Sequence, residues 1–175
     1  MSAPEFSRPV RLDTLGPEPR PLTFEAEAEE RAALAKRFGL VAIERLSADV
    51  RLVRNGVEIK ASGRIAAVAV QSCVASGQSV DAIIDEPFHL VFRPLPSEAR
   101  PDEEVELNDL ELDVVFYEGG SIDLGEAVAE TMVLSLDPYP RAPGSEEVLK
   151  AAGVKSEEDA GPFGALAGLR DKLKK

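Results

Sequence analysis

Apolar and polar residues alternate on both sides of Asn55-Gly56, which is typical of two strands that each bury one face. Asn-Gly is a strong signal for a two-residue hairpin turn, because both turn positions favour a positive φ. With these two residues as the turn, Arg54 pairs with Val57 and Arg51 faces Lys60. The apolar face of the hairpin then consists of Leu46, Ala48, Val50, Leu52, Ile59, Ala61, Gly63 and Ile65.

The opposite face of the predicted hairpin is polar, and its basic residues are Arg45, Arg51, Lys60 and Arg64. Asp49 and Glu58 compensate only part of this positive charge. A one-residue slip would mix the two faces, so the alternation specifies which side chains are buried. Lysines and arginines on such a face are typical of a solvated surface, and the alternative is a surface that binds RNA or another anion.

The second strand of the hairpin continues to about Ser72, and a turn over residues 73–79 leads to a third strand at 80–92. In that strand Phe88, Leu90 and Phe92 alternate inward. A short strand is predicted at 113–117. The proline-rich residues 1–22 read as an extended lead-in with one edge strand within 6–12.

A first helix is predicted at 25–38, with Thr23 as its N-cap and Gly39 as a left-handed residue that ends it. A second helix begins at about Asp123, which forms a capping-box-like pair with Glu126. Prolines 138 and 140 end this helix. Its apolar stripe consists of Leu124, Ala127, Val128, Thr131, Met132 and Leu136.

These elements predict an α+β fold, with an antiparallel sheet and two main helices packed on its apolar face. The remaining strand order, and whether the sheet curls into a partial barrel, stay open. We expect a single α+β domain at 1–140 with an extended N-terminal lead-in, a mobile linker at 141–161, and a short amphipathic C-terminal helix at 162–175.

The net charge of −12 argues against a protein that coats nucleic acid through bulk electrostatics, but this charge is unevenly distributed. Residues 1–64 carry +1, residues 65–169 carry −16, and the last six residues carry +3. Seven of the acids lie between Asp102 and Asp113, without the spacing of a calcium loop. The asymmetry indicates two kinds of contact surface.

Candidate chemistry is sparse. The single cysteine, Cys73, and the single histidine, His89, exclude an intramolecular disulfide and an intramolecular Cys/His zinc site. No nucleophile motif or phosphate loop is present, so we expect no enzymatic activity, no cofactor, no metal and no small-molecule substrate. No segment has the length and apolarity of a membrane helix or signal peptide, and we therefore expect a cytoplasmic protein.

Four segments together resemble the YceD family, the bacterial large ribosomal RNA subunit accumulation proteins, and most resemble its alphaproteobacterial branch. They are EAEAEERAALAKRFGL (25–40), VQSCVASGQSV (70–80), SIDLGEAVAETMVLSLDPYPRAPG (121–144) and GPFGALAGL (161–169). The family-motif positions are Cys73, Asp123, Leu124, Gly125, Pro138, Pro140, Pro162 and Phe163. Many family members carry a C-x-x-C pair at the turn where this chain has Ser76 as the fourth residue, so no metal or redox role is carried over.

The resemblance implies a non-enzymatic role in accumulation or maturation of large-subunit ribosomal RNA. The partner is then either the ribosomal RNA precursor or a basic ribosomal protein. Direct RNA contact would use Arg45, Arg51, Lys60, Arg64, Arg170, Lys172, Lys174 and Lys175. The −16 block favours the protein partner, because it would repel phosphates over about 8–10 Å. The alternative is a small cytoplasmic adaptor that docks a partner through residues 161–175 and has no ribosomal role.

Overall fold

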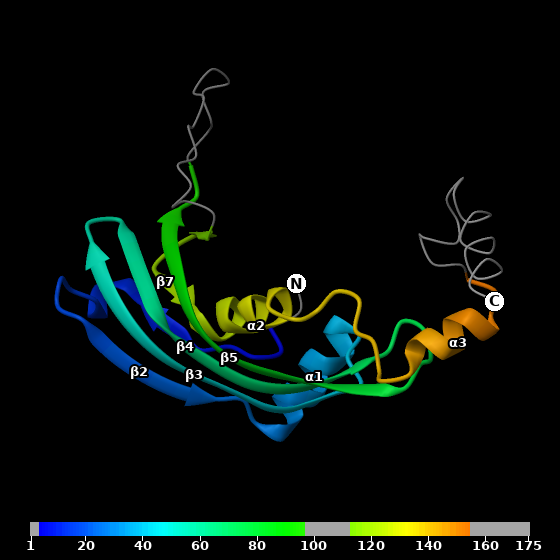
Figure 1. The fold of residues 1–175 in the computed structure, drawn as a ribbon. Helices are drawn as coiled ribbons and strands as arrows, with labels where there is room; N and C mark the ends of the chain where they lie inside the picture. Colours follow the sequence, from blue (N-terminus) through cyan, green and yellow to red (C-terminus); the bar gives the residue numbers. More distant parts are fainter. Residues whose placement is uncertain (1–3, 97–112, 155–175) are drawn as a thin grey trace, which may run out of the picture. The chain divides into compact units, whose positions relative to one another are not determined.

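The structure is a computed structural model that describes residues 4–96 and 113–154 (Figure 1). The chain divides into two compact units. The first contains Met1–Gln71 and Asp81–Asp137, and the second contains Ser72–Val80 and Pro138–Lys175. The predicted tail helix at 162–175 and most of the acidic run after Asp102 lie outside the described residues.

A five-stranded sheet with the order β2-β3-β4-β5-β6 dominates the first unit. Its strands are β2 (Arg20–Glu25), β3 (Ala42–Asn55), β4 (Glu58–Ser72), β5 (Ser79–Pro94) and β6 (Val114–Tyr117). Antiparallel pairing joins β2 to β3 and β3 to β4, whereas β6 runs parallel to β5. The sheet is mostly antiparallel, as expected, and it does not close into a barrel.

A second, two-stranded sheet pairs β1 (Pro9–Arg11) with β7 (Ser121–Asp123), and a 3-10 helix, η1 (Leu12–Thr14), follows β1. The edge strand predicted within 6–12 is therefore present. The strand β2 was not predicted, because the proline-rich lead-in does not show a two-residue alternation on its own. It pairs with the edge of β3 that β4 does not occupy.

The hairpin of β3 and β4 has the predicted faces but a different register. Asn55 pairs with Glu58, so the turn is Gly56-Val57 and Arg54 faces Ile59 rather than Val57. The register is shifted by two residues, and a shift of two leaves every side chain on its original face. The predicted contact of Arg51 with Lys60 is wrong, because their actual partners are Ser62 and Val53 respectively.

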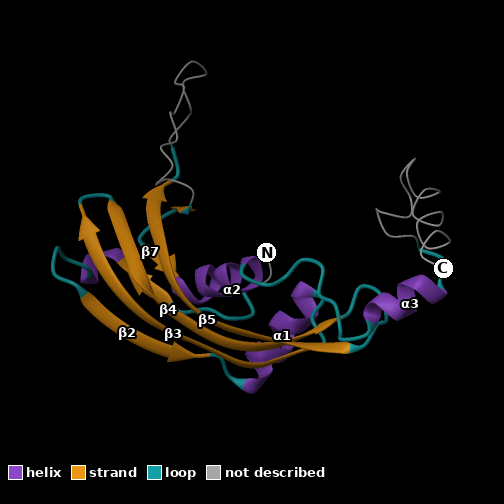
Figure 2. Cartoon of the chain, in the orientation of Figure 1, coloured by secondary structure: helices purple, strands orange, loops and turns teal. Residues whose placement is uncertain are grey.

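The described residues form three α-helices, α1 (Ala28–Phe38), α2 (Leu124–Leu134) and α3 (Ser145–Ala151) (Figure 2). Helix α1 begins later than predicted, with Glu27 as its N-cap, because Thr23 belongs to β2. Gly39 ends α1 with φ of 67°, as predicted. Helix α3 lies within 141–161, where the sequence predicted a linker.

The core lies between the sheet and helices α1 and α2. Figure 1 shows α2 over the concave face of the curved strands β3, β4 and β5. Helix α2 buries Leu124, Ala127, Val128 and Met132 of the predicted stripe, and it ends at Leu134, before the prolines. From the sheet, the predicted apolar face is buried except for the half-buried Gly63, and the side chains of Phe88, Leu90 and Phe92 are buried as well.

Within the described ranges, no helix combines the length and apolarity needed to cross a membrane.

Candidate functional site

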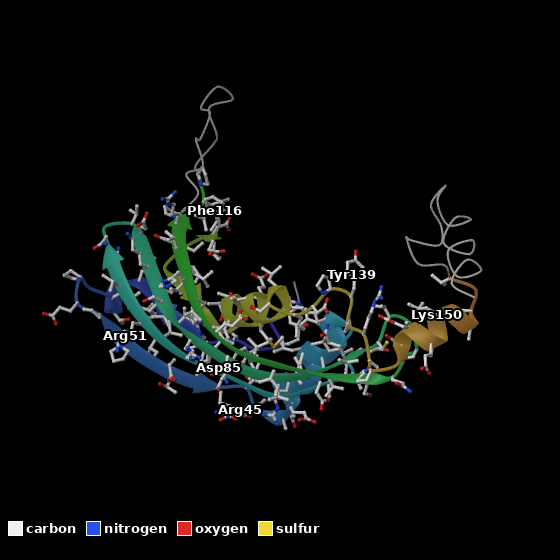
Figure 3. All side chains as sticks on the ribbon, in the orientation of Figure 1. Arg45, Arg51, Asp85, Phe116, Tyr139 and Lys150 are labelled. Carbon is white, nitrogen blue, oxygen red and sulfur yellow. The ribbon has the colours of Figure 1, made fainter. Side chains whose placement is uncertain are left out.

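The polar face of the sheet carries all four basic residues that the hairpin pattern predicted, and each of them is exposed. Because β3 and β4 alternate, Arg45 and Arg51 project from β3 and Lys60 and Arg64 from β4, away from the core. Figure 3 shows Arg45, Arg51 and Asp85 on the side of the sheet opposite α2. The sequence thus predicts correctly that these cations share a face.

Acids on neighbouring positions compensate part of this positive charge. The guanidinium of Arg64 donates hydrogen bonds to the carboxylate and to the backbone oxygen of Asp85 in β5. Arg64, with a smaller contribution from Arg45, lowers the pKa of Asp85. Sequence reasoning counted the hairpin alone and missed Asp85, which reaches this face only when β5 pairs with β4.

A second compensated cluster centres on Glu58. Its carboxylate lies 3.2 Å from Nε of Arg93 and 3.6 Å from Nζ of Lys60. The Glu58 carboxylate, at the start of β4, therefore forms ion pairs with both Arg93 and Lys60. Both ion pairs are partly exposed, so each contributes little to stability, but together they reduce the positive potential of the face.

Arg45 has no hydrogen bond or ion pair with the described residues, although it contributes to the lowered pKa of Asp85. Arg51 likewise has no hydrogen bond or ion pair with the described residues. It borders a shallow groove of about 500 Å³ on the polar face, together with Thr23, Asp49, Ser62, Arg64 and His89. The hydroxyl of Thr23 donates to Asp49 Oδ1 at 2.6 Å. The groove thus presents one free cation beside a carboxylate and hydroxyl groups, which suits polar side chains of a protein as well as a single phosphate.

The family-motif positions at the start of α2 have structural roles. The carboxylate of Asp123 accepts hydrogen bonds from the backbone of Gly125 at 3.0 Å and Glu126 at 3.3 Å, as the predicted N-cap. It also accepts from Ser7 Oγ and from the backbone N–H of Arg8 at 2.8 Å. Asp123 therefore caps α2 and holds the N-terminal segment.

Leu124 and Gly125 also contribute to this contact between the start of α2 and the N-terminal segment. The side chain of Leu124 is buried in the core. A Cβ atom on Gly125 would lie 2.5 Å from the backbone oxygen of Phe6, so only glycine allows the N-terminal segment to pass this closely. The Ile-Asp-Leu-Gly sequence at 122–125 thus reads as a packing and capping motif.

In the second unit, the remaining described motif positions gather around the turn after β4. The backbone N–H of Val74 donates to the oxygen of Pro140 at 2.9 Å. The N–H of Ala142 donates to Sγ of Cys73 at 3.2 Å. Pro140 is buried, whereas Pro138 is exposed. The turn and the DPYPRA segment, 65 or more positions apart in the sequence, are therefore directly bonded.

Cys73 is buried and unpaired, and its thiol is acidic. Hydrogen bonds from the Ala142 amide and the Ser76 hydroxyl lower the pKa of Cys73 to about 6, against the opposing effect of burial. Ser76, the fourth residue of the turn segment that begins at Cys73, thus contacts the sulfur through its hydroxyl. Among the described residues, no three His, Cys, Asp or Glu side chains are grouped so as to hold a metal ion.

The remaining predicted positions lie outside the described residues: Pro162, Phe163, Arg170, Lys172, Lys174 and Lys175.

Comparison with known proteins gives one match. The model of the family described as "Large ribosomal RNA subunit accumulation protein YceD" matches residues 61–170, more than half of the chain. Of the four segments that resemble the family, 25–40 lies outside the match. The alphaproteobacterial branch stays a prediction. No curated protein and no solved structure matches the chain. The match, which includes both the turn at Cys73 and the start of α2, shows that the chain belongs to the YceD family of large ribosomal RNA subunit accumulation proteins.

Proposed function

We propose that this protein is a non-enzymatic cytoplasmic factor that supports large-subunit ribosomal RNA accumulation by binding a basic ribosomal protein or an assembly intermediate. The family gives the coarse role, which is accumulation of the large-subunit ribosomal RNA. The observation that carries the choice of partner is the compensated polar face. Of its four predicted RNA-binding cations, Lys60 and Arg64 form ion pairs with acids. Arg45 interacts electrostatically with Asp85, and Arg51 lies in the same groove as Asp49. A phosphate backbone would therefore meet little net positive charge.

Acidic side chains are the more available charges. Exposed acids without an ion pair among the described residues include Asp81, Glu86 and Glu118 of the first unit and Glu146 and Glu147 of the second. Residues 65–169 carry a net charge of −16. Such a surface attracts basic proteins and accelerates their association, and it repels phosphates within about a Debye length.

The first experiment identifies the molecules that the protein contacts in cells. The tagged full-length chain is crosslinked, fractionated on a ribosome gradient, and immunoprecipitated, and both RNA and protein are identified. We expect co-sedimentation with early large-subunit particles and crosslinks to a basic ribosomal protein. RNA crosslinks concentrated on residues 45–64 would contradict protein-mediated action and favour direct RNA contact.

The second experiment compares charge variants in cells that lack the native gene. Neutralisation of Asp81→Asn, Glu86→Gln, Glu146→Gln and Glu147→Gln together is expected to lower large-subunit ribosomal RNA. The matched control neutralises exposed acids of the near-neutral first third, Glu18→Gln and Glu29→Gln, and should leave RNA levels unchanged. The charge reversals Arg51→Glu and Lys60→Glu should also have no effect, and a loss of RNA there would instead support the basic face as an RNA surface.

A further inference from the structure

The two edges of the five-stranded sheet differ in how they are protected. Edge strand β2 contains Pro21, which has no N–H to offer, and it begins and ends with charged residues, Arg20 and Glu25. Both features prevent another strand from pairing there. Edge strand β6, Val114–Tyr117, has the sequence VVFY, with no proline and no charge. Its composition favours strand pairing.

The backbone of β6 directs hydrogen-bonding groups away from the sheet. On the inner side, the oxygen of Asp113 accepts from Val91 and the oxygen of Tyr117 accepts from Leu95, both at 2.9 Å. Backbone groups alternate in direction along a strand, so residues 113, 115 and 117 face β5. The N–H and C=O of Val114 and Phe116 therefore point outward, and they have no partner among the described residues.

Exposed apolar side chains surround this edge. Phe116 is 53% exposed, Leu95 is 51% exposed and Val57, in the β3–β4 turn, is 63% exposed. The Tyr117 hydroxyl donates to the backbone oxygen of Val57 at 2.6 Å and holds the turn against β6. Figure 3 shows Phe116 near the end of β5, remote from Arg45 and Asp85. Exposed apolar side chains beside an open strand edge offer the contacts that strand addition uses.

We propose that the outer edge of β6 binds an extended basic segment of a partner protein, which adds to the sheet as a further strand. This inference rests on the proposed function and names the surface at which the partner docks. Main-chain hydrogen bonds from Val114 and Phe116 supply part of the affinity, and the exposed side chain of Phe116 supplies an apolar contact for alternate side chains of the segment.

The charges at the two ends of β6 favour a basic segment as the added strand. The strand is flanked by two exposed acids, Asp113 and Glu118, which form no ion pair with the described residues. A basic segment would be attracted to both ends of β6. A second copy of this chain, paired antiparallel, would bring the Asp113 end of one strand beside the Glu118 end of the other, and like charges at such positions destabilise the pair. RNA would meet the same carboxylates.

The test uses the full-length protein and a short synthetic peptide of alternating lysine and valine as the probe. Amide hydrogen exchange is measured by NMR with and without the peptide. We expect slower exchange at the amides of Val114 and Phe116, which point outward. The amide of Thr23 is the internal control: Ala26 donates to Leu46 across β2 and β3, so by alternation Thr23 points outward on the protected edge and should be unaffected.

Two peptide controls separate strand addition from general attraction to an acidic protein. The same peptide with alternate backbone amides N-methylated keeps its charge but loses the pairing groups, and it should bind about tenfold more weakly or worse. The glutamate–valine counterpart should not bind. Equal affinity of the N-methylated peptide would overturn the proposal, and so would protection of the Val114 and Phe116 amides in the free protein.

Variants test the same edge. Phe116→Pro removes an outward N–H without touching the ladder to β5, and proline is tolerated at such edge positions. We expect it to weaken peptide binding about tenfold. Phe116→Thr keeps the N–H and isolates the loss of the aromatic ring. The matched control, Thr23→Pro, removes an outward N–H from β2 and should leave affinity unchanged.

Peptide binding and particle association can fail separately. A protein that co-sediments with large-subunit particles but does not protect the β6 amides would overturn strand addition alone. A protein that binds the peptide at β6 but never associates with assembly particles would overturn the proposed function.

Discussion

The guanidinium of Arg37 in α1 donates to both carboxylate oxygens of Glu126 in α2, at 2.9 and 2.6 Å, across 89 positions of sequence. The same guanidinium donates to Glu5 at 3.1 Å. These bonds raise the pKa of Arg37 above its usual range, chiefly through Glu126. Glu126, expected from the sequence to complete a capping box, thus fastens one helix to the other.

Glu126→Gln should therefore lower the free energy of unfolding by about 1 kcal/mol, because the pair is bidentate but about one-third exposed at Arg37. Urea denaturation checks this value. The control is Glu130→Gln, since Glu130 lies 4.0 Å from the same guanidinium and its side chain is half exposed. A loss as large for Glu130 as for Glu126 would contradict the assigned role.

Asp123→Ala should destabilise the protein by about 2 kcal/mol, because one carboxylate both caps α2 and bonds Ser7 and Arg8. Asp123→Asn keeps a capping oxygen and should recover part of the loss. Thermal unfolding compares the two variants. If they are equally unstable, the bonds to Oδ1 are not the important interaction and the bond from Ser7 to the other carboxylate oxygen is.

Gly63→Ala should cost about 3 kcal/mol or more, because the added Cβ would lie 1.9 Å from the backbone oxygen of Asp49. Strand β3 must move away from β4 to accommodate it. Gly16→Ala is the control, since nothing lies within 4 Å of a Cβ at that position. Urea denaturation of both variants measures the difference, and equal stabilities would show that the close approach is absent in solution.

Stability should rise with pH through the titration of Cys73. Its pKa in the folded protein is about 6, below the ordinary thiol value of 9, so the folded state favours the thiolate. The stabilisation is fully present above about pH 9, declines as pH falls, and is lost below about pH 6. Urea denaturation across this window should show the slope in the native protein and a smaller one in Cys73→Ser.

Thiolate absorbance in the ultraviolet provides an independent measurement of the same pKa. Ala142 and Ser76 stabilise the thiolate by hydrogen bonding, so Ser76→Ala should move the midpoint upward. An unchanged midpoint would show that the Ser76 hydroxyl does not stabilise the thiolate.

Local alternation was sufficient to predict the faces of the β3–β4 hairpin but not its register. Burial of Leu46 and Ile59 is equally satisfied by registers that differ by two residues, because each side chain then stays on its face. The choice of Gly56-Val57 as the turn, over Asn55-Gly56, therefore depends on interactions that the hydrophobic pattern does not contain. The pair of Arg51 and Lys60 failed for this reason.

Features that depend on distant pairing were the ones that the sequence did not predict. Strand β2 exists because β3 offers it an edge, and Phe24 pairs with Ala48 across 24 positions. The pairing of β6 parallel to β5 likewise has no local signal. For the candidate site, the cations of the polar face were predictable from the hairpin pattern. Asp85, which forms an ion pair with Arg64, was not, because it belongs to another strand, β5.

The pairing of β1 with β7 has a consequence for the order in which the chain folds during synthesis. Ser7 and Asp123, hydrogen-bonded in this joint, are 116 positions apart. A ribosome adds roughly 5–20 residues per second, so the first strand to emerge waits several seconds for its partner. Phe6, which is fully buried in the finished fold and adjoins Gly125, is incompletely covered during that interval. The N-terminal segment thus acquires its partner late in synthesis, and until then its apolar residues are open to binding by a chaperone.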